Sequence, residues 1–209
     1  MHDGSRVRIA AIAAAVASML LHGPGSAQEV GVFFDEGAQT CVAAVEPFGP
    51  AVRTHLFVFA EDGTALNGAI LRLLLRPGFR IRSELWPRNT THEGSLISFN
   101  GVDVTFEGCV IAQGPVLLLS FDLVDEGLRP GPEPDVVLRL EGGTVVADSL
   151  TLTEPHLKVC DPDDPFGEEP QLIAAKSIQA TLNCTGDCPC ATAIGRKTWS
   201  AVKRLFLER

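Results

Sequence analysis

Residues 95–124 constrain the fold of this chain more than any other stretch. Phe99, Val102, Val104 and Phe106 recur with a period near two, and an unbroken apolar run follows at 116–119. Alternation with a period of two is typical of a strand with one buried face, whereas an unbroken run suits a strand covered on both faces. We therefore expect this stretch to form the centre of an antiparallel β-core.

Further strands are expected on both sides of this centre. An apolar segment at 69–76 has a composition that also suits a helix, but Pro77 and Gly78 limit it to strand length. Since residues 79–85 alternate strictly, the two segments predict a β-hairpin. Other short strands are expected at 30–34, 40–45, 52–60, 136–140, 144–152, 156–159 and 177–182. About ten short strands with turn signals between them indicate a sandwich or barrel, and we predict an all-β antiparallel sandwich over residues 28–185.

The first 27 residues have the composition of a secretory signal peptide. Arg6 and Arg8 precede an apolar segment at 9–21, and small residues end the segment before Gln28. The apolar segment is shorter than the ~20 residues that a membrane-spanning helix needs. We expect a chain that is secreted, periplasmic or held at the cell surface, with an uncleaved N-terminal anchor as the alternative.

The charge balance disfavours two classes of partner. Cleavage before Gln28 would remove Asp3, Arg6 and Arg8 and leave 15 basic and 25 acidic side chains, a formal net charge of −10. Such a field repels phosphate backbones and anionic lipid head groups. We therefore expect neither a nucleic-acid partner nor an anionic membrane surface.

An even number of cysteines behind an export signal favours disulfide bonds over free thiols. The six are Cys41, Cys109, Cys160, Cys184, Cys188 and Cys190. The sequence alone does not choose among their pairings. Our first hypothesis pairs Cys160 with Cys184 across an acidic loop. The second pairs Cys41 with Cys109, which leaves Cys188 and Cys190 to bond each other or a partner. A zinc site is not expected, because no nearby residue completes the four ligands.

The acidic loop between Cys160 and Cys184 is the best candidate for a metal site. Carboxylates placed close together in a loop are suitable ligands for Ca²⁺. The candidate ligands are Asp161, Asp163, Asp164 and Glu168, followed by Glu169. The loop does not fit the EF-hand pattern, since Phe166 stands at the glycine position and Leu172 at the glutamate position. A solvated loop without an ion is the alternative.

No catalytic constellation is visible in the sequence. His55, His92 and His156 are the histidines beyond residue 27, and no serine lies in a Gly-x-Ser-x-Gly motif. His92 and Glu93 begin like a zinc-protease helix, but Leu96 stands where the second histidine is required. His55 lies in an apolar strand and is interpreted as a packed histidine. We expect a chain that is not an enzyme and binds no cofactor.

The C-terminal residues 186–209 form a cysteine-containing connector and a predicted amphipathic helix. One stripe of the helix carries the apolar side chains, which are Trp199, Val202, Leu205 and Phe206. So short a helix is not stable alone in water, and its stripe must pack on another surface. Its own sandwich and an anchoring partner are the two alternatives.

The strand pattern resembles that of cohesin-type and other immunoglobulin-like sandwiches over about residues 50–150. The residues that carry the resemblance are GPVLLLSFDLV, a Gly/Pro linker at 125–134 and then DVVLRLEGG. The chain is also similar to secreted bacterial β-sandwich proteins in which an FFDE-like strand opens the domain and a Trp-x-x-Val/Ile-Lys helix closes it. Cohesin-like domains bind protein partners, so the resemblance implies a protein-binding role and carries over no individual functional residue.

These observations predict an exported, non-enzymatic β-sandwich that acts in surface or extracellular protein interaction. The alternative is a carbohydrate-active or other hydrolytic module that uses acidic residues and bound calcium. Five arginines are expected on the outer face of the predicted hairpin, as a solvated face or as a patch for an acidic ligand. They are Arg72, Arg76, Arg80, Arg82 and Arg88.

Overall fold

The computed structural model describes residues 28–129, 131–145, 150–161 and 170–188. These residues form strands, turns and loops, with no helix among them. Within the described ranges, therefore, no helix is present that could cross a membrane. The predicted signal peptide at 1–27 and the predicted helix at 198–208 lie outside the described residues and stay predictions.

The described residues contain fifteen strands. In chain order they are β1 (Glu29–Phe33), β2 (Val42–Ala43), β3 (Val52–Phe59), β4 (Ala65–Leu74), β5 (Phe79–Leu85), β6 (Thr90–Gly94), β7 (Val102–Ile111), β8 (Val116–Asp125), β9 (Val136–Glu141), β10 (Thr144–Val145), β11 (Leu150–Thr151), β12 (His156–Val159), β13 (Gln171–Ala174), β14 (Lys176–Ile178) and β15 (Ala180–Leu182).

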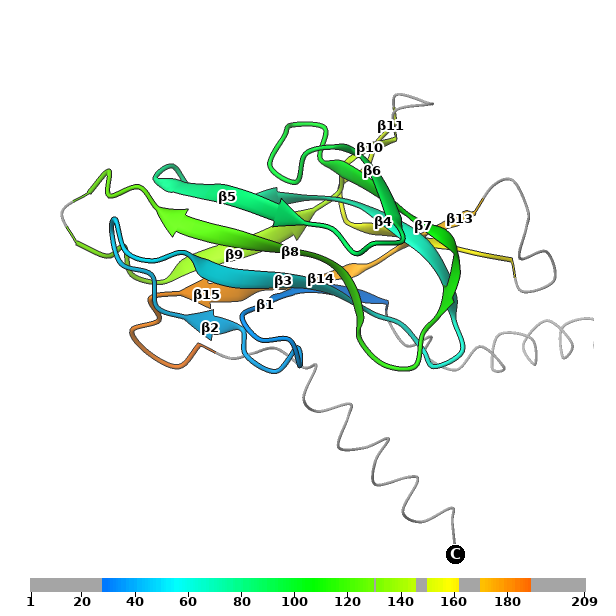
Figure 1. Ribbon diagram of the computed structural model, residues 1–209, viewed down its shortest axis with the longest axis horizontal. Coiled ribbons are helices and arrows are strands. Elements are labelled where there is room, and N and C mark those ends of the chain that lie inside the picture. The colour runs from blue at the N-terminus through cyan, green and yellow to red at the C-terminus, as the bar shows by residue number, and fades with distance from the viewer. Residues whose placement is uncertain (1–27, 130, 146–149, 162–169, 189–209) are drawn as a thin grey trace, which may run out of the picture.

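The strands form two sheets that lie one behind the other (Figure 1). The first sheet has the order β14-β1-β3-β8-β5, and the second has the order β13-β12-β4-β9-β15-β2, with β7 beside β4 and β6 beside β7. The predicted sandwich is confirmed, but its sheets are mixed, because β14 lies parallel to β1 and β15 lies parallel to β2. Parallel neighbouring strands need a long connection between them. Here each parallel pair places a strand from the start of the domain beside a strand from its end.

The core lies between the sheets, where side chains of neighbouring strands lie opposite one another. Leu56 of β3 lies opposite Leu119 of β8 in the first sheet, and Leu73 of β4 lies opposite Leu140 of β9 in the second. All four side chains are buried. Burying a leucine side chain stabilises a fold by about 1.5–3 kcal/mol, so these paired rows supply the main driving force for sandwich formation.

The stretch 95–124 divides between the two sheets. Val102, Val104 and Phe106 of β7 are buried, as the alternation predicts, and β8 lies between β3 and β5 inside the first sheet. Phe99 is 79% exposed, because it lies in the turn before β7 begins rather than within the strand. The predicted central position is confirmed for the strand that contains the unbroken apolar run.

The predicted hairpin of residues 69–76 with 79–85 is wrong. β4 pairs with β7, β9 and β12, whereas β5 pairs with β8 in the other sheet. The turn between them, in which the amide of Phe79 donates to the carbonyl of Arg76 at 3.2 Å, carries the chain across the sandwich. Residues 79–85 alternate because β5 has one face in the core, and alternation does not reveal which sheet a strand joins.

Candidate functional site

Two disulfide bonds lie wholly within the described residues, and they differ from the predicted pairs. Cys109 is bonded to Cys160, and Cys184 is bonded to Cys188. β7 and β12 flank the start of β4 and bring Cys109 and Cys160 to a Cα–Cα distance of 6.3 Å. The 160–184 and 41–109 pairings are therefore wrong. Cys41 is also disulfide-bonded. The arrangement of strands in the sheet determines which cysteines come close enough to pair. The sequence alone does not reveal this arrangement, because it does not give the strand order.

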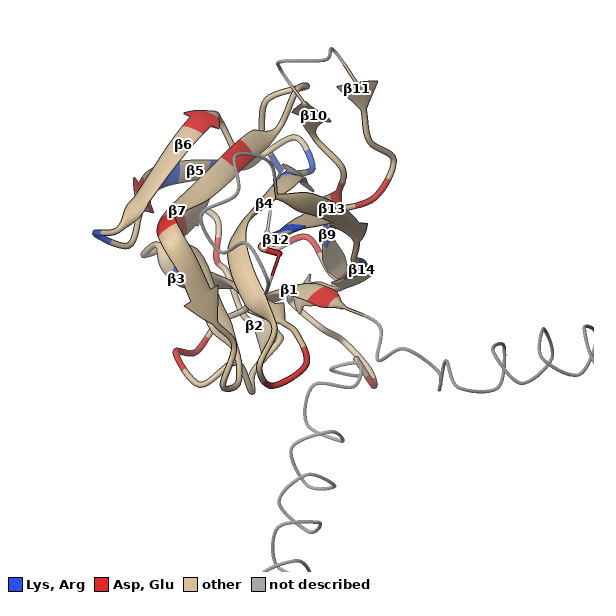
Figure 2. Ribbon diagram, turned by 90° about the vertical axis from the view of Figure 1, so that its right-hand side faces the viewer, with Lys and Arg blue, Asp and Glu red and all other residues tan. Residues whose placement is uncertain are grey.

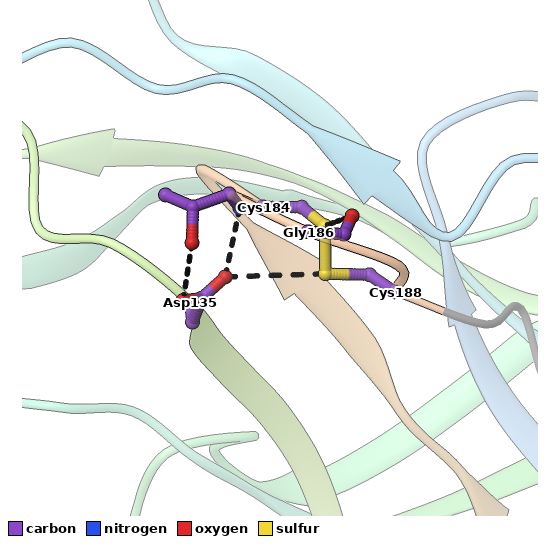
Figure 3. The surroundings of a disulfide bond; sticks show 5 residues. Asp135, Cys184, Gly186 and Cys188 are labelled. Atoms are coloured by element: carbon purple, nitrogen blue, oxygen red, sulfur yellow. Dashed lines mark hydrogen bonds between the residues drawn. A yellow bond between two sulfur atoms is a disulfide. The ribbon is translucent and has the colours of Figure 1, made fainter.

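The Cys184–Cys188 bond closes a small loop against Asp135, the residue that precedes β9 (Figure 3). The Asp135 carboxylate accepts the Thr185 amide at 2.9 Å and the Thr185 hydroxyl at 2.7 Å. These two hydrogen bonds hold the pKa of Asp135 below its usual range. One ligand atom each of Asp135, Cys184 and Cys188 lies within 4.8 Å of the others. Because both sulfurs are oxidised in the disulfide, they are not the thiolates that bind zinc.

Most of the predicted calcium loop lies outside the described residues. Asp163, Asp164 and Glu168 fall in the range 162–169, and only Asp161 is described, as an exposed residue next to Cys160. The calcium site and the hydrolytic alternative that depends on it therefore stay predictions. A calcium-dependent rise in melting temperature would support them.

His55 is packed inside the fold, as predicted. It is 6% exposed, and its Nδ1 lies 2.8 Å from the Oγ of Ser120 on the neighbouring strand β8. Burial lowers the pKa of His55, with a smaller opposing effect from the carboxylate of Glu36. Serine and histidine side chains in contact are two parts of a catalytic triad. The carboxylate of Asp122, two residues along β8 from Ser120, instead accepts from Arg53 at 2.6 Å and from Ser83 at 2.7 Å, so Asp122 does not orient the His55 ring.

The other two histidines lie apart from His55. The ring of His92 stacks on that of Trp86 with 4.0 Å between centroids, and His156 Nδ1 lies 2.8 Å from the carbonyl oxygen of Glu154. His92 is on β6 and His156 is on β12, so the three rings do not converge. These three histidines, all in the described part of the chain, therefore form neither a shared metal site nor a shared proton-transfer site.

The predicted arginine face is replaced by separate ion pairs. Arg72 is 2.7 Å from Glu141, Arg76 is 2.9 Å from Glu133, and Arg80 is 3.2 Å from Glu126. In the end view, acidic residues lie on β6, on β7 and in several loops rather than on one face (Figure 2). These three arginines already have carboxylate partners, which favours the solvated interpretation over a patch that awaits an acidic ligand.

An exposed apolar surface lies on the outer side of the second sheet, where Phe99 meets β4. The guanidinium carbon of Arg72 is 5.6 Å from the centre of the Phe99 ring, and Arg72 Nη1 donates to the Phe99 carbonyl at 3.2 Å. Arg72 faces Glu141 across the β4–β9 pair, and Leu74 faces Arg139. Two exposed apolar side chains, those of Leu74 and Val137, lie on the same side of the sheet as Arg72. We call the set Phe99, Arg72, Leu74 and Val137 the Phe99 surface.

Sequence reasoning missed the Phe99 surface. The period of two predicts Phe99 on the buried face of a strand, and the predicted hairpin places Arg72 on its outer face. Two signals in the sequence were available. The Phe99–Val102 spacing breaks the period of two, and Asn100 and Gly101 mark a turn between these residues. A ring at a turn is more exposed than a ring within a buried strand.

The chain is similar in fold to solved cohesin modules. No protein-family model matches the sequence, and no curated protein matches it. A cohesin from Clostridium thermocellum solved in an OlpC cohesin–dockerin complex is 12% identical, with 78% of this chain and 98% of the other covered and a TM-score of 0.47. The seventh ScaB type I cohesin from Pseudobacteroides cellulosolvens is 8% identical, with coverage of 78% and 94% and a TM-score of 0.46. A non-cellulosomal cohesin from the archaeon Archaeoglobus fulgidus is 12% identical, with coverage of 77% and 93% and a TM-score of 0.44.

Each of these structures is similar to this chain over about three quarters of its length. At such low identities the likeness concerns the arrangement of strands and transfers no residue role.

Proposed function

We propose that this chain is an exported, non-enzymatic module that binds a protein partner through the Phe99 surface. The observation that carries the proposal is a phenylalanine ring that is 79% exposed and yet held in place by Arg72. Phenylalanine and arginine are both enriched at protein interfaces relative to the rest of the protein surface.

The way Phe99 is held favours binding over chance exposure. Arg72 contacts both the ring and the carbonyl of Phe99, and Glu141 fixes Arg72 from the neighbouring strand. A ring that is already ordered loses little conformational entropy when a partner covers it. Burying a phenylalanine side chain stabilises a complex by about 1.5–3 kcal/mol, so one ring can account for a large part of a modest affinity.

The disulfides support an extracellular place of action. Cys109–Cys160 joins residues 51 apart in the sequence, and Cys184–Cys188 closes a short loop. Such bonds persist in oxidising compartments and are rare in reducing ones. Together with the predicted signal peptide they favour export.

Capture of partners from an envelope extract of the producing organism tests the proposal. The immobilised full chain is compared with F99A and with I111A, which shortens another half-exposed apolar side chain, at the end of β7. We expect a protein that is retained by the wild type and by I111A and lost with F99A. Equal retention by all three chains would show that the Phe99 surface is not the binding site.

A further inference from the structure

We propose that the C-terminal segment of this chain docks its apolar stripe on a second exposed surface, at the loop end of the sandwich near Phe48. This site is distinct from the Phe99 surface. The occupant is intramolecular, and the stripe consists of Trp199, Val202, Leu205 and Phe206. Four observations support this assignment.

The first observation is the backbone of Phe48. Its side chain is 81% exposed, and its φ angle is +58°. A bulky residue in the left-handed region is strained, and such strain persists only where the surroundings impose it. The Phe48 amide donates to the carbonyl of Asp125 at 3.0 Å, and the amide of Gly49 donates to that of Glu46 at 2.9 Å. The loop between β2 and β3 is thus fixed in a conformation that projects an apolar ring outward.

The second observation is the apolar neighbourhood of this ring. Gly127 has a φ of +64°, and a Cβ atom there would overlap the Phe48 ring, so the ring lies directly on the Gly127 backbone. The next residue, Leu128, is 68% exposed, and a Cβ atom at Gly78 would be 3.8 Å from its side chain. Phe48 and Leu128 are thus exposed apolar residues on either side of the contact at Gly127, and we call the set Phe48, Gly127 and Leu128 the Phe48 surface.

The third observation is where the chain leaves the described fold. The Asn183 side chain accepts the Val45 amide at 2.7 Å and donates to the Glu133 carbonyl at 2.9 Å. Val45 begins the loop that contains Phe48, and Glu133 lies in the loop that contains Leu128. The turn that ends at Cys188, the last described residue, is therefore fastened to both loops of the Phe48 surface. All three loops lie at the same end of the sandwich (Figure 1).

The fourth observation is the length and pattern of the segment that follows. An extended chain reaches up to ~3.5 Å per residue, so the eleven residues from Cys188 to Trp199 span up to about 38 Å, which is enough to return over the adjacent loops. The stripe that begins at Trp199 needs an apolar surface, because a helix of this length is not stable in water alone. The Phe48 surface is an exposed apolar area, and its loops are hydrogen-bonded to the turn from which this segment starts.

Fluorescence of Trp199 tests the docking. The chain has two tryptophans, so W86F leaves Trp199 as the sole reporter in the full-length protein. We expect blue-shifted emission that does not change on dilution, a shift to the red when F48A and L128A are added, and no shift with I111A. Emission typical of an exposed indole, or emission insensitive to F48A and L128A, would overturn the proposal. Loss of the blue shift on dilution would also overturn it, because it would assign the surface to a second copy.

A photo-crosslinker placed at position 48 provides a second measurement that does not depend on tryptophan. We expect a crosslink within one chain to a peptide from 198–208, found by mass spectrometry. A crosslink that joins two chains, or one to a different peptide, would contradict the proposal. F99A should leave the Trp199 emission unchanged, and F48A should leave the partner capture unchanged, so each proposal can fail without the other.

Discussion

The Phe99 and Phe48 surfaces both expose a phenylalanine ring, but different parts of the chain hold the two rings. Phe99 is held by a side chain, the guanidinium of Arg72, which a strand of the second sheet positions. Phe48 is held by its own strained backbone and rests on a glycine. A ring held by one side chain can be released by one substitution at small cost, whereas a ring held by the backbone changes only when the loops themselves change.

The largest effect is expected from G127A, which attacks the backbone support of Phe48. Alanine at a φ of +64° is strained by about 1–2 kcal/mol, and its methyl group also displaces the Phe48 ring. We expect the free energy of unfolding, measured by urea denaturation, to fall by about 1–3 kcal/mol.

G131A is the matched control for this prediction. Gly131 also has a positive φ, of +93°, but a Cβ atom there would contact nothing within 4 Å. It should lose only the backbone contribution of about 1–2 kcal/mol. Equal losses in G127A and G131A would show that the ring does not depend on Gly127.

A smaller effect is expected from R72A, which removes the side-chain support of Phe99. The Arg72–Glu141 pair is partly buried, and we expect a loss of about 1 kcal/mol in the free energy of unfolding together with weaker partner capture. R53A removes an ion pair with Asp122 on the other sheet and serves as the control. If R53A weakened capture as much as R72A did, the binding role of the Phe99 surface would be disproved.

The smallest effect is expected from lowering the pH, which protonates Asp135 beside the turn that precedes the C-terminal segment. The pKa of Asp135 is lowered in the folded chain, so its hydrogen bonds to Thr185 are present above the ordinary carboxylate pKa of about 4 and are lost as the pH falls through the folded value. In the W86F chain, we expect Trp199 emission to shift to the red below about pH 4. D135N should remove this transition or shift its midpoint, and an identical transition in D135N would assign it to another group.

The sequence predicted the strands better than it predicted their neighbours. The alternation through Val102, Val104 and Phe106 reflects burial, which is a local property, and that prediction held. In the apolar run at 116–119, Leu118 and Leu119 are buried and the first two residues are half-buried. The hairpin and the disulfide pairs failed because they depend on which strands lie side by side. Cys109 and Cys160 come together because β7 and β12 both pair with the start of β4.

The Phe99 and Phe48 surfaces illustrate the same limit for the candidate sites. The period of two predicts that Phe99 is buried, although the chain turns at this residue. Phe48 lies in a loop, where no periodic pattern indicates its exposure. What places Phe48 is the approach of Gly127, a residue 79 positions later in the chain. Contacts between such distant positions are a consequence of the fold and are not visible in the local pattern.

The parallel pairs of β1 with β14 and of β2 with β15 also constrain when the domain can form. Each sheet takes strands from both ends of the domain, so neither is complete until residues 176–182 are available. Pairing between distant segments is slow, because loop-closure entropy must be overcome before the contacts form. If the chain is exported through a translocation channel, as proposed, its sheets would therefore stay incomplete until almost the whole domain has crossed.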